Sequence, residues 1–440
     1  MPAVETQNVN GSSPSKKQKG EVPSATVSME ARVLAAINKH GIPAKSICIA
    51  SDHLKGGYIC DTFRVTIEYA DGDAAPTSER PASAIVKRSC ETGGDHAVAL
   101  ALKLYEREWH FYESGLSAEM PLRVPRYFGS LLSDDGESTV GVLLEDLCLP
   151  GAVLAPELDE AGVLLTARHV AKLHAKYWND PKLASGALGI RRHDDAWFKP
   201  SWLDAVAGYW PKFEAKWRVP DGRRPEELPE EAFAVGEQIV RHYGWVQTAV
   251  SSAPHTFVHG DVKPGNMFMM ADKTPAFIDW QYTAVGKGCA APPASRRPRP
   301  PRTSRAALAP PPLLPTSSPP LLPLSALLTL SALLGASLRS CADLCFMIIE
   351  GYDVATCTAL EPKVKAEYLK ALKAEGVSDY TAADLDRDWQ LATLHFPFYV
   401  AMWFGTTPDE QVVDPDFPRR FVPRAFAAIL RNGSHKLLPA

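Results

Sequence analysis

Two short loops at a fixed spacing constrain the fold of this chain more than any other feature of its sequence. Residues 259–266 read HGDVKPGN, and residues 278–280 read IDW. Asp261 lies five residues before Asn266, and Asn266 lies thirteen residues before Asp279. Two aspartates and an asparagine at this spacing have to be placed together by the fold if they act as one site.

The residues between the two loops predict a β-hairpin. Apolar runs at 267–270 and 276–278 flank a turn at 271–274. A hairpin returns the chain to the end at which it started. We therefore expect Asn266 and Asp279 to lie at the same end of the hairpin, within reach of one metal ion.

Such a set of groups suits phosphoryl transfer from ATP. That reaction needs a carboxylate beside the acceptor hydroxyl, oxygen ligands for Mg²⁺, and cations or amide N–H groups around the phosphates. The two loops offer the carboxylate and the oxygen ligands. ATP and Mg²⁺ are therefore the expected cofactors.

The HGDxxxxN run followed by IDW resembles the signature of the aminoglycoside phosphotransferase and choline-kinase-like superfamily. Within it, the IDWQ run at 278–281 is similar to the CHK-kinase-like and ecdysteroid-kinase-like branch. The resemblance implies a protein-kinase-like fold and a small-molecule hydroxyl acceptor. It further implies that Asp261 is the catalytic base and that Asn266 and Asp279 bind Mg²⁺.

Kinases of this type need a lysine on the third strand that pairs with a helix glutamate. Residues 84–87 read AIVK, so Lys87 is expected at the ATP phosphates. Glu108, in a run that resembles the ExxFY motif of the family, is the expected partner. Glu106 and Glu113 are rival partners for the same lysine.

Two further segments are expected to meet the nucleotide. Residues 143–147 read LLEDL and resemble the hinge of the family, where backbone groups of Glu145 and Leu147 would contact adenine. The pair Gly56 and Gly57 stands where the phosphate-covering loop would be, because glycine lets backbone N–H groups approach oxygens closely. An ordinary turn is the alternative at that pair.

Three residues are expected to support the catalytic loop. His259 and Lys263 lie within the loop itself, and Asp343 resembles the aspartate of a DLA motif that braces the loop by hydrogen bonds. His174 belongs to an LHAxxW run that resembles a helix beneath the loop. We expect it to pack in the core rather than act in catalysis.

Hydrophobic periodicity predicts an α+β fold in which a β-rich region precedes a helical one. Ser28 is the expected cap of the first helix. Strands are expected over 57–69, 82–86, 126–132 and 139–144, and helices over 29–39, 96–113, 159–178, 201–215, 229–252, 361–375, 381–404 and 417–432.

By the resemblance, these elements make a two-lobed fold with a small β-rich N-lobe and a larger helical C-lobe. The expected divisions are a disordered tail (1–28), a nucleotide-binding N-lobe (29–147), a C-lobe segment with the catalytic loop and metal strand (148–289), a low-complexity insertion (290–341) and the remaining C-lobe with acceptor-side helices (342–440).

The insertion is rich in proline, leucine and alanine, which is typical of a disordered segment. Its run at 321–338 is long enough to span a membrane, but proline, glycine and hydroxyl residues interrupt it. The dipeptide Cys-Ala occurs at both junctions. Removing 290–341 would place Asp343 twelve rather than 64 residues after Asp279. We interpret the segment as an addition, such as untranslated sequence retained in a gene model.

Composition restricts the partners. The formal net charge of -4 provides no broad basic field, so nucleic acid is not expected as a partner. Eight cysteines without a CxxC pair favour reduced thiols and a cytoplasmic location. No membrane partner is expected, and the chain is predicted to be a monomer or a weak dimer.

The acceptor and two rival functions stay open. An amino alcohol, a sterol-like alcohol and an aminoglycoside-like compound are all compatible with the sequence. The aromatic run 395–404 could wall the acceptor pocket or belong to the core. A protein Ser/Thr kinase is one rival, although Gly260 replaces the arginine of HRD and no APE motif follows. A catalytically inactive binding protein with the same fold is the other.

Overall fold

The computed structural model describes most of the chain outside the two low-complexity regions. The described residues are 27–54, 59–70, 77, 79–90, 96, 99–100, 103–148, 151–155, 157–190, 199–218, 228–251, 255–287, 341–409, 412 and 414–440. The glycine pair Gly56 and Gly57, nearly all of the expected tail 1–28 and all of the insertion 290–341 except its last residue lie outside them.

A five-stranded antiparallel sheet forms the N-terminal part, in the order β1-β2-β3-β5-β4. Its strands are β1 (Ala44–His53), β2 (Cys60–Tyr69), β3 (Ser83–Ser89), β4 (Tyr127–Leu132) and β5 (Thr139–Glu145). The four expected strands are confirmed. The strand β1 was not predicted, because it is an edge strand whose apolar residues, such as Ile47 and Ile49, are only partly buried.

The two faces of this sheet pack against different helices. Successive side chains of a strand point to opposite faces. Leu143 of β5 packs with Val33 and Ile37 of α1 (Met29–Lys39), whereas Val142 and Leu144 join the larger core. The Ser28 hydroxyl accepts a hydrogen bond from the Ala31 N–H at 3.2 Å, which confirms the expected cap of α1.

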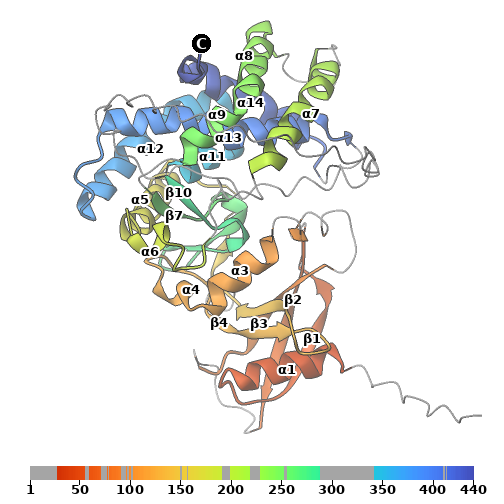
Figure 1. Ribbon diagram of the computed structural model, residues 1–440. Helices are drawn as coiled ribbons and strands as arrows, with labels where there is room; N and C mark the ends of the chain where they lie inside the picture. Colours follow the sequence, from red (N-terminus) through yellow and green to blue (C-terminus); the bar gives the residue numbers. More distant parts are fainter. Residues whose placement is uncertain are drawn as a thin grey trace, which may run out of the picture.

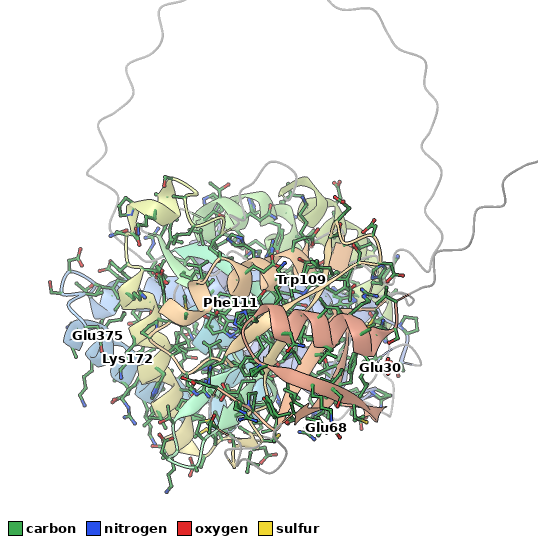
Figure 2. The ribbon with its side chains drawn as sticks, turned by 90° about the horizontal axis from the view of Figure 1, so that it is seen from below. Glu30, Glu68, Trp109, Phe111, Lys172 and Glu375 are labelled. Carbon is green, nitrogen blue, oxygen red and sulfur yellow. The ribbon has the colours of Figure 1, made fainter. Side chains whose placement is uncertain are left out.

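The larger core continues into the helical part. It includes α3 (Leu104–Glu113), which is followed by the short α4 (Leu116–Glu119). Phe111 and Trp109 of α3 are buried, whereas Glu30, Glu68, Lys172 and Glu375 are exposed (Figure 2). Figure 1 shows the sheet and α1 at one end of the molecule, helices α7 to α14 at the other, and β7 and β10 between them.

Helices dominate the remainder of the chain, and the α+β class is confirmed. They are α5 (Glu160–Lys176), α6 (Pro181–Ala184), α7 (Lys199–Trp217), α8 (Glu230–Arg241), α9 (Tyr243–Ser251), α11 (Ala342–Gly351), α12 (Val354–Ala374), α13 (Ala382–Thr406), α14 (Phe417–Arg431) and the 3₁₀ turn η5 (Ser434–Leu437).

Three helix predictions were wrong in extent. The helix expected over 96–113 is interrupted at Lys103, whose backbone is left-handed with φ of 55°, so that α3 begins at Leu104. The single helix expected over 229–252 is two helices, because the chain breaks at His242 and turns Tyr243 toward His395 of α13. The helix expected over 361–375 begins at Val354, since the Asp353 side chain caps it by accepting the Thr356 N–H. No helix among the described residues is long and apolar enough to cross a membrane.

Short strands flank the two loops of the sequence signature, 259–266 and 278–280. β7 (His255–Val258) pairs antiparallel with β10 (Ala284–Lys287), and β8 (Met267–Met269) pairs antiparallel with β9 (Pro275–Phe277). The predicted hairpin is confirmed. β6 (Val153–Leu154) adds an edge strand beside β8. The catalytic loop therefore runs from the end of β7 to the start of β8.

Candidate active site

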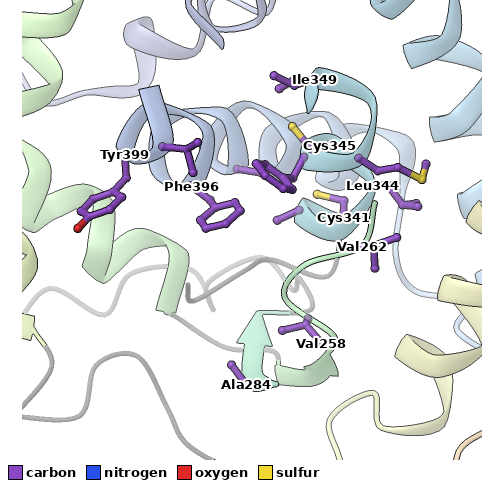
Figure 3. Packing of buried hydrophobic residues seen from close by; sticks show 14 of the residues in the cluster. Val258, Val262, Ala284, Cys341, Leu344, Cys345, Ile349, Phe396 and Tyr399 are labelled. Atoms are coloured by element: carbon purple, nitrogen blue, oxygen red, sulfur yellow. The ribbon is translucent and has the colours of Figure 1, made fainter. Parts of the chain in front are cut away.

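The carboxylate of Asp343 binds the backbone of the catalytic loop, residues 259–266. Asp343, in the first turn of α11, accepts the backbone N–H of His259 at 3.0 Å and that of Gly260 at 2.9 Å. Figure 3 shows Val258 and Val262, which flank these residues, and Leu344 of α11 among the buried side chains that pack around the loop. Polar and apolar contacts together attach the loop to α11.

Asp261 is nearly buried and is oriented by two neighbours. The Asn266 side-chain amide donates to Asp261 Oδ2 at 2.8 Å, and Lys263 Nζ lies 3.1 Å from the same oxygen. Burial alone would lower the pKa of Lys263, but Asp261 and Glu350 outweigh burial and raise it. Lys263 therefore stays positively charged beside the Asp261 carboxylate.

His259 supports the loop as a neutral imidazole. Burial lowers the pKa of His259 below its ordinary value. Its Nδ1 accepts the Asp261 backbone N–H at 3.2 Å, so the proton lies on Nε2, which donates to the Ile278 carbonyl at 3.0 Å. One ring thereby joins the catalytic loop to the residue before Asp279.

The hairpin brings the expected metal ligands to one end. Met267 pairs with Phe277, and the Ile278 N–H donates to the Asn266 carbonyl at 3.0 Å. Asn266 and Asp279 therefore flank the open end of the β8–β9 pair. Asp279 has a left-handed backbone, with φ of 66°, which turns the chain sharply into the 3₁₀ turn η2 (Trp280–Tyr282).

Gln281 belongs to the same site, and sequence reasoning gave it no role although it completes the IDWQ run. Its Nε2 donates to Asp279 Oδ2 at 3.1 Å. Its amide oxygen is buried and has no hydrogen-bond partner in the described part of the chain. A buried oxygen without a donor is costly unless a ligand satisfies it.

These oxygens suit Mg²⁺. The Asn266 amide nitrogen points at Asp261, which directs its oxygen away from that carboxylate. Asp279, Asn266 and Gln281 together offer one carboxylate and two amide oxygens, the hard ligands that Mg²⁺ prefers. Among the described residues, no group of three or more His, Cys, Asp or Glu side chains gathers for a metal. The cation would rely on the amide oxygens.

Lys87 joins the N-terminal sheet to this site. It lies on the central strand β3, opposite Thr62 and Val142. Its Nζ lies 2.7 Å from Glu108 Oε2 and 2.6 Å from Asp279 Oδ1. Burial alone would lower the pKa of Lys87, but the two carboxylates raise it well above its ordinary value. The ammonium group is therefore charged.

Of the three candidate glutamates, Glu108 is the one that faces Lys87. Glu106 is exposed, and Glu113 accepts the Thr139 hydroxyl at 2.7 Å. The second oxygen of Glu108 accepts the Trp280 N–H at 3.3 Å. Trp280 also stacks on Phe111, with ring centroids 4.3 Å apart, so α3 packs directly against the turn that follows Asp279.

The expected hinge lies at the end of β5. Leu147 is buried, and Glu145 is the last residue of the strand. The Glu145 N–H donates to the Arg126 carbonyl at 2.8 Å. An adenine ring would therefore have to use other backbone groups between Glu145 and Leu147.

Two more residues near the loop were not assigned to the site from the sequence. His174, expected only as a core residue, is fully buried with Nε2 3.4 Å from Asp343 Oδ2 and Nδ1 2.9 Å from the Tyr368 hydroxyl. Glu350 lies near the end of α11, and burial, together with Asp261, raises its pKa. The contact of α11 with the loop was expected from the motif around Asp343, but the sequence does not show which other side chains face the loop.

Comparison with known proteins identifies one family. A family model described as the phosphotransferase enzyme family matches residues 16–287, more than half of the 440-residue chain. The match ends just before the low-complexity segment. No curated protein matches the chain significantly.

Several solved structures are similar to this one, at low identity. Plasmodium vivax ethanolamine kinase matches with 10% identity over 88% of this chain and 82% of its own, at a TM-score of 0.42. A choline kinase from Streptococcus pneumoniae matches with 10% identity over 87% and 94%, at 0.45. A putative aminoglycoside phosphotransferase from Ralstonia eutropha matches with 12% identity over 93% and 98%, at 0.46. Scores this low carry no information about the substrate.

Proposed function

The chain belongs to the phosphotransferase enzyme family, and from that premise we propose that it transfers the terminal phosphoryl group of ATP to a hydroxyl of a small molecule. One observation carries this proposal. Lys87 contacts both Glu108 and Asp279. The hairpin that ends at Asp279 begins at Asn266, and the Asn266 side chain binds Asp261. We assign residues 29–147 to the nucleotide and the helices after 342 to the acceptor.

Asp261 acts as the base in this proposal. Its carboxylate, held by Asn266 and Lys263, accepts the proton of the acceptor hydroxyl as that oxygen attacks phosphorus. Lys87 holds the phosphates of ATP, and Glu108 fixes the position of the ammonium group. Asp343 and His259 keep the loop that carries the base in place.

Asn266, Asp279 and Gln281 would hold Mg²⁺. When bound, the ion neutralises charge on the phosphates and positions them for in-line attack. Asp279 is the one ligand of the three that also contacts Lys87. The same carboxylate therefore links the metal to the cation expected at the phosphates.

Glu350 favours a polar acceptor. A Cβ at the neighbouring Gly351 would lie 3.9 Å from Pro264 Cγ, so this end of α11 lies against the catalytic loop. The Glu350 carboxylate lies near the cations Lys263, Arg424 and Arg420, yet burial raises its pKa above the ordinary value. An ammonium group on the acceptor would add a further charged donor beside it. This favours an amino alcohol or an aminoglycoside-like compound over a sterol-like alcohol.

Turnover across an acceptor panel tests the proposal. ADP release would be measured with amino alcohols, aminoglycosides and sterol-like alcohols, with Mg²⁺ and with excess EDTA. We expect release that depends on both Mg²⁺ and a polar acceptor. Tight ATP binding without turnover of any acceptor would contradict the proposal and favour an inactive binding protein. Phosphorylation of peptides alone would favour the protein-kinase alternative.

Glu350→Gln tests the acceptor side separately. We expect the KM for amine-bearing acceptors to rise about tenfold, equivalent to about 1.4 kcal/mol, with the KM for ATP unchanged. Glu375→Gln, at an exposed residue far along the chain, is the matched control. An unchanged acceptor KM in Glu350→Gln would remove this residue from the acceptor site.

We further propose a cytoplasmic location. All seven described cysteines are free thiols, as a reducing compartment requires.

A further inference from the structure

Two consecutive carboxylates lie at the expected hinge, Glu145 as the last residue of β5 and Asp146 directly after it, and each is held by its own set of donors. Successive residues at the end of a strand point to opposite faces. Glu145 and Asp146 are therefore fixed from opposite sides of the same short backbone segment.

The Asp146 side chain, only 1% exposed, is the more heavily bonded of the two. Arg64 of β2 donates to it from Nε at 2.5 Å and from Nη2 at 3.2 Å. The Ser83 hydroxyl of β3 donates at 2.5 Å, and the Cys148 backbone N–H donates at 3.2 Å. Burial would raise the pKa of Asp146, but the hydrogen bonds from Arg64 and Ser83 lower it, so the group stays ionised.

Glu145 connects the same segment to the β8–β9 hairpin, which carries the expected metal ligands at its open end. Its carboxylate accepts Arg123 Nη2 at 2.6 Å and the Arg126 backbone N–H at 3.0 Å. The Arg123 carbonyl in turn accepts the N–H of Phe277, in the strand that leads to Asp279, at 2.8 Å. Arg123 thereby links the hinge to β9.

Stability alone does not account for these contacts. The Asp146 side chain is buried whereas the Arg64 side chain is 37% exposed, and the cost of taking the carboxylate out of water offsets much of its attraction to Arg64. Such pairs do fix geometry. The segment between Glu145 and Leu147 is held in one position before any ligand arrives.

We propose that Asp146 and Glu145 are nucleotide-positioning residues whose side-chain contacts hold the hinge backbone in the arrangement that a purine base requires, and thereby set the preference for one base over another. The inference rests on the proposed function, because it presupposes a nucleotide at the hinge. A preformed site binds more tightly, since it pays no ordering cost on binding.

The test removes the donors to Asp146 one at a time, from the partly exposed Arg64 and from the buried Ser83. Arg64→Met and Ser83→Ala each remove donors and leave the carboxylate in place, and Arg64→Lys restores one charged donor. We expect the KM and the calorimetric Kd for ATP to rise about tenfold in Arg64→Met, with kcat within about twofold of wild type. The ratio of ATP to GTP affinity should fall toward one, and Arg64→Lys should recover part of both.

Arg32→Met is the matched control. It breaks another arginine–aspartate pair of the N-terminal part, between Arg32 of α1 and the exposed Asp134 at 2.6 Å, away from the hinge. We expect it to change the melting temperature only. If Arg64→Met also lowers only the melting temperature, with ATP and GTP affinities unchanged, the contacts are structural and the inference is wrong.

Calorimetry separates this inference from the proposed function. If wild type turns over no acceptor but binds ATP, and Arg64→Met weakens that binding selectively, the proposed function fails and the hinge inference holds. If wild type binds neither ATP nor GTP, both fail.

Discussion

Gly260 is the residue of the catalytic loop whose surroundings leave least choice of side chain. Its φ is 90°, a backbone conformation that side chains rarely adopt. A Cβ at this position would lie 2.3 Å from the Tyr282 carbonyl oxygen. The N–H of the same residue binds Asp343, so the loop cannot shift without losing that hydrogen bond.

Gly260→Ala should therefore destabilise the protein and abolish turnover. The backbone conformation alone costs alanine about 1–2 kcal/mol, and the clash adds to it. Urea denaturation measures the loss. Gly265→Ala is the control, because a Cβ there meets no atom within 4 Å, and its stability should stay within about 1 kcal/mol of wild type. Equal stabilities for the two variants would contradict this account of the loop.

Site residues could be predicted from the sequence where they lie close together along the chain. Asp261 and Asn266 lie in one short loop, and the β8–β9 hairpin, which can be predicted from its turn residues, returns the chain from Asn266 to Asp279. The choice of Glu108 over its rivals depends on how α3 faces β3. Gln281 and Glu350 could not be assigned, because a glutamine or glutamate shows its role only through the groups that surround it.

Among the elements, α13 shows what periodicity cannot decide. Its aromatic run 395–404 was compatible with a pocket wall or with the core. Every residue from His395 to Met402 is buried, and only Trp403 and Phe404 near the helix end are partly exposed. A helix that is apolar on all sides has no preferred face in the sequence. Its neighbours, α7, α9, α11 and α14, decide the outcome.

Burial of His395 in this helix predicts an acid-sensitive contribution to stability. Burial lowers the pKa of His395 from 6.5 to about 3. Below pH 6.5 the unfolded chain binds a proton that the folded chain does not, so this contribution is complete above pH 6.5 and falls with decreasing pH, by roughly 1.4 kcal/mol per pH unit until the folded pKa is reached.

His395→Gln, which keeps an acceptor for the Tyr243 hydroxyl, isolates this contribution. Urea denaturation of both proteins between pH 7 and pH 5 would give the difference in their free energies of unfolding. We expect the advantage of wild type to shrink as the pH falls through this range. A difference that stays constant with pH would show that His395 is protonated in the folded protein.

At the scale of the whole molecule, the large core joins α3 and β5 to the helices α11 to α14. Helix α11 enters this core directly after the segment 290–341 and still places Asp343 against the catalytic loop. The α+β class could be predicted, because strand and helix periodicities occur in separate regions. The division into two lobes stays a prediction, since one core cluster spans both parts.

Deleting residues 290–341 should leave an active enzyme. Ala284 pairs with Val258, directly before the loop that Asp343 binds, and Lys287 lies three residues further along β10, about 10 Å away. After the deletion, four peptide steps connect Lys287 to Asp343. They span up to roughly 13 Å, so Asp343 can still reach the loop. Because loop closure becomes less costly, the free energy of unfolding should rise by roughly 2 kcal/mol. Loss of the folded state on deletion would show that the segment is part of the fold.

Asp261→Asn tests the central claim most directly. Asparagine keeps the size of the side chain and one acceptor oxygen for Asn266, but it cannot accept the proton of an acceptor hydroxyl. Phosphoryl transfer to the best acceptor and the calorimetric Kd for ATP would be measured on the same preparation. We expect transfer to fall by about 10²–10⁴-fold with the Kd for ATP nearly unchanged. Transfer at the wild-type rate would contradict the assignment of Asp261 as the base of a small-molecule phosphotransferase.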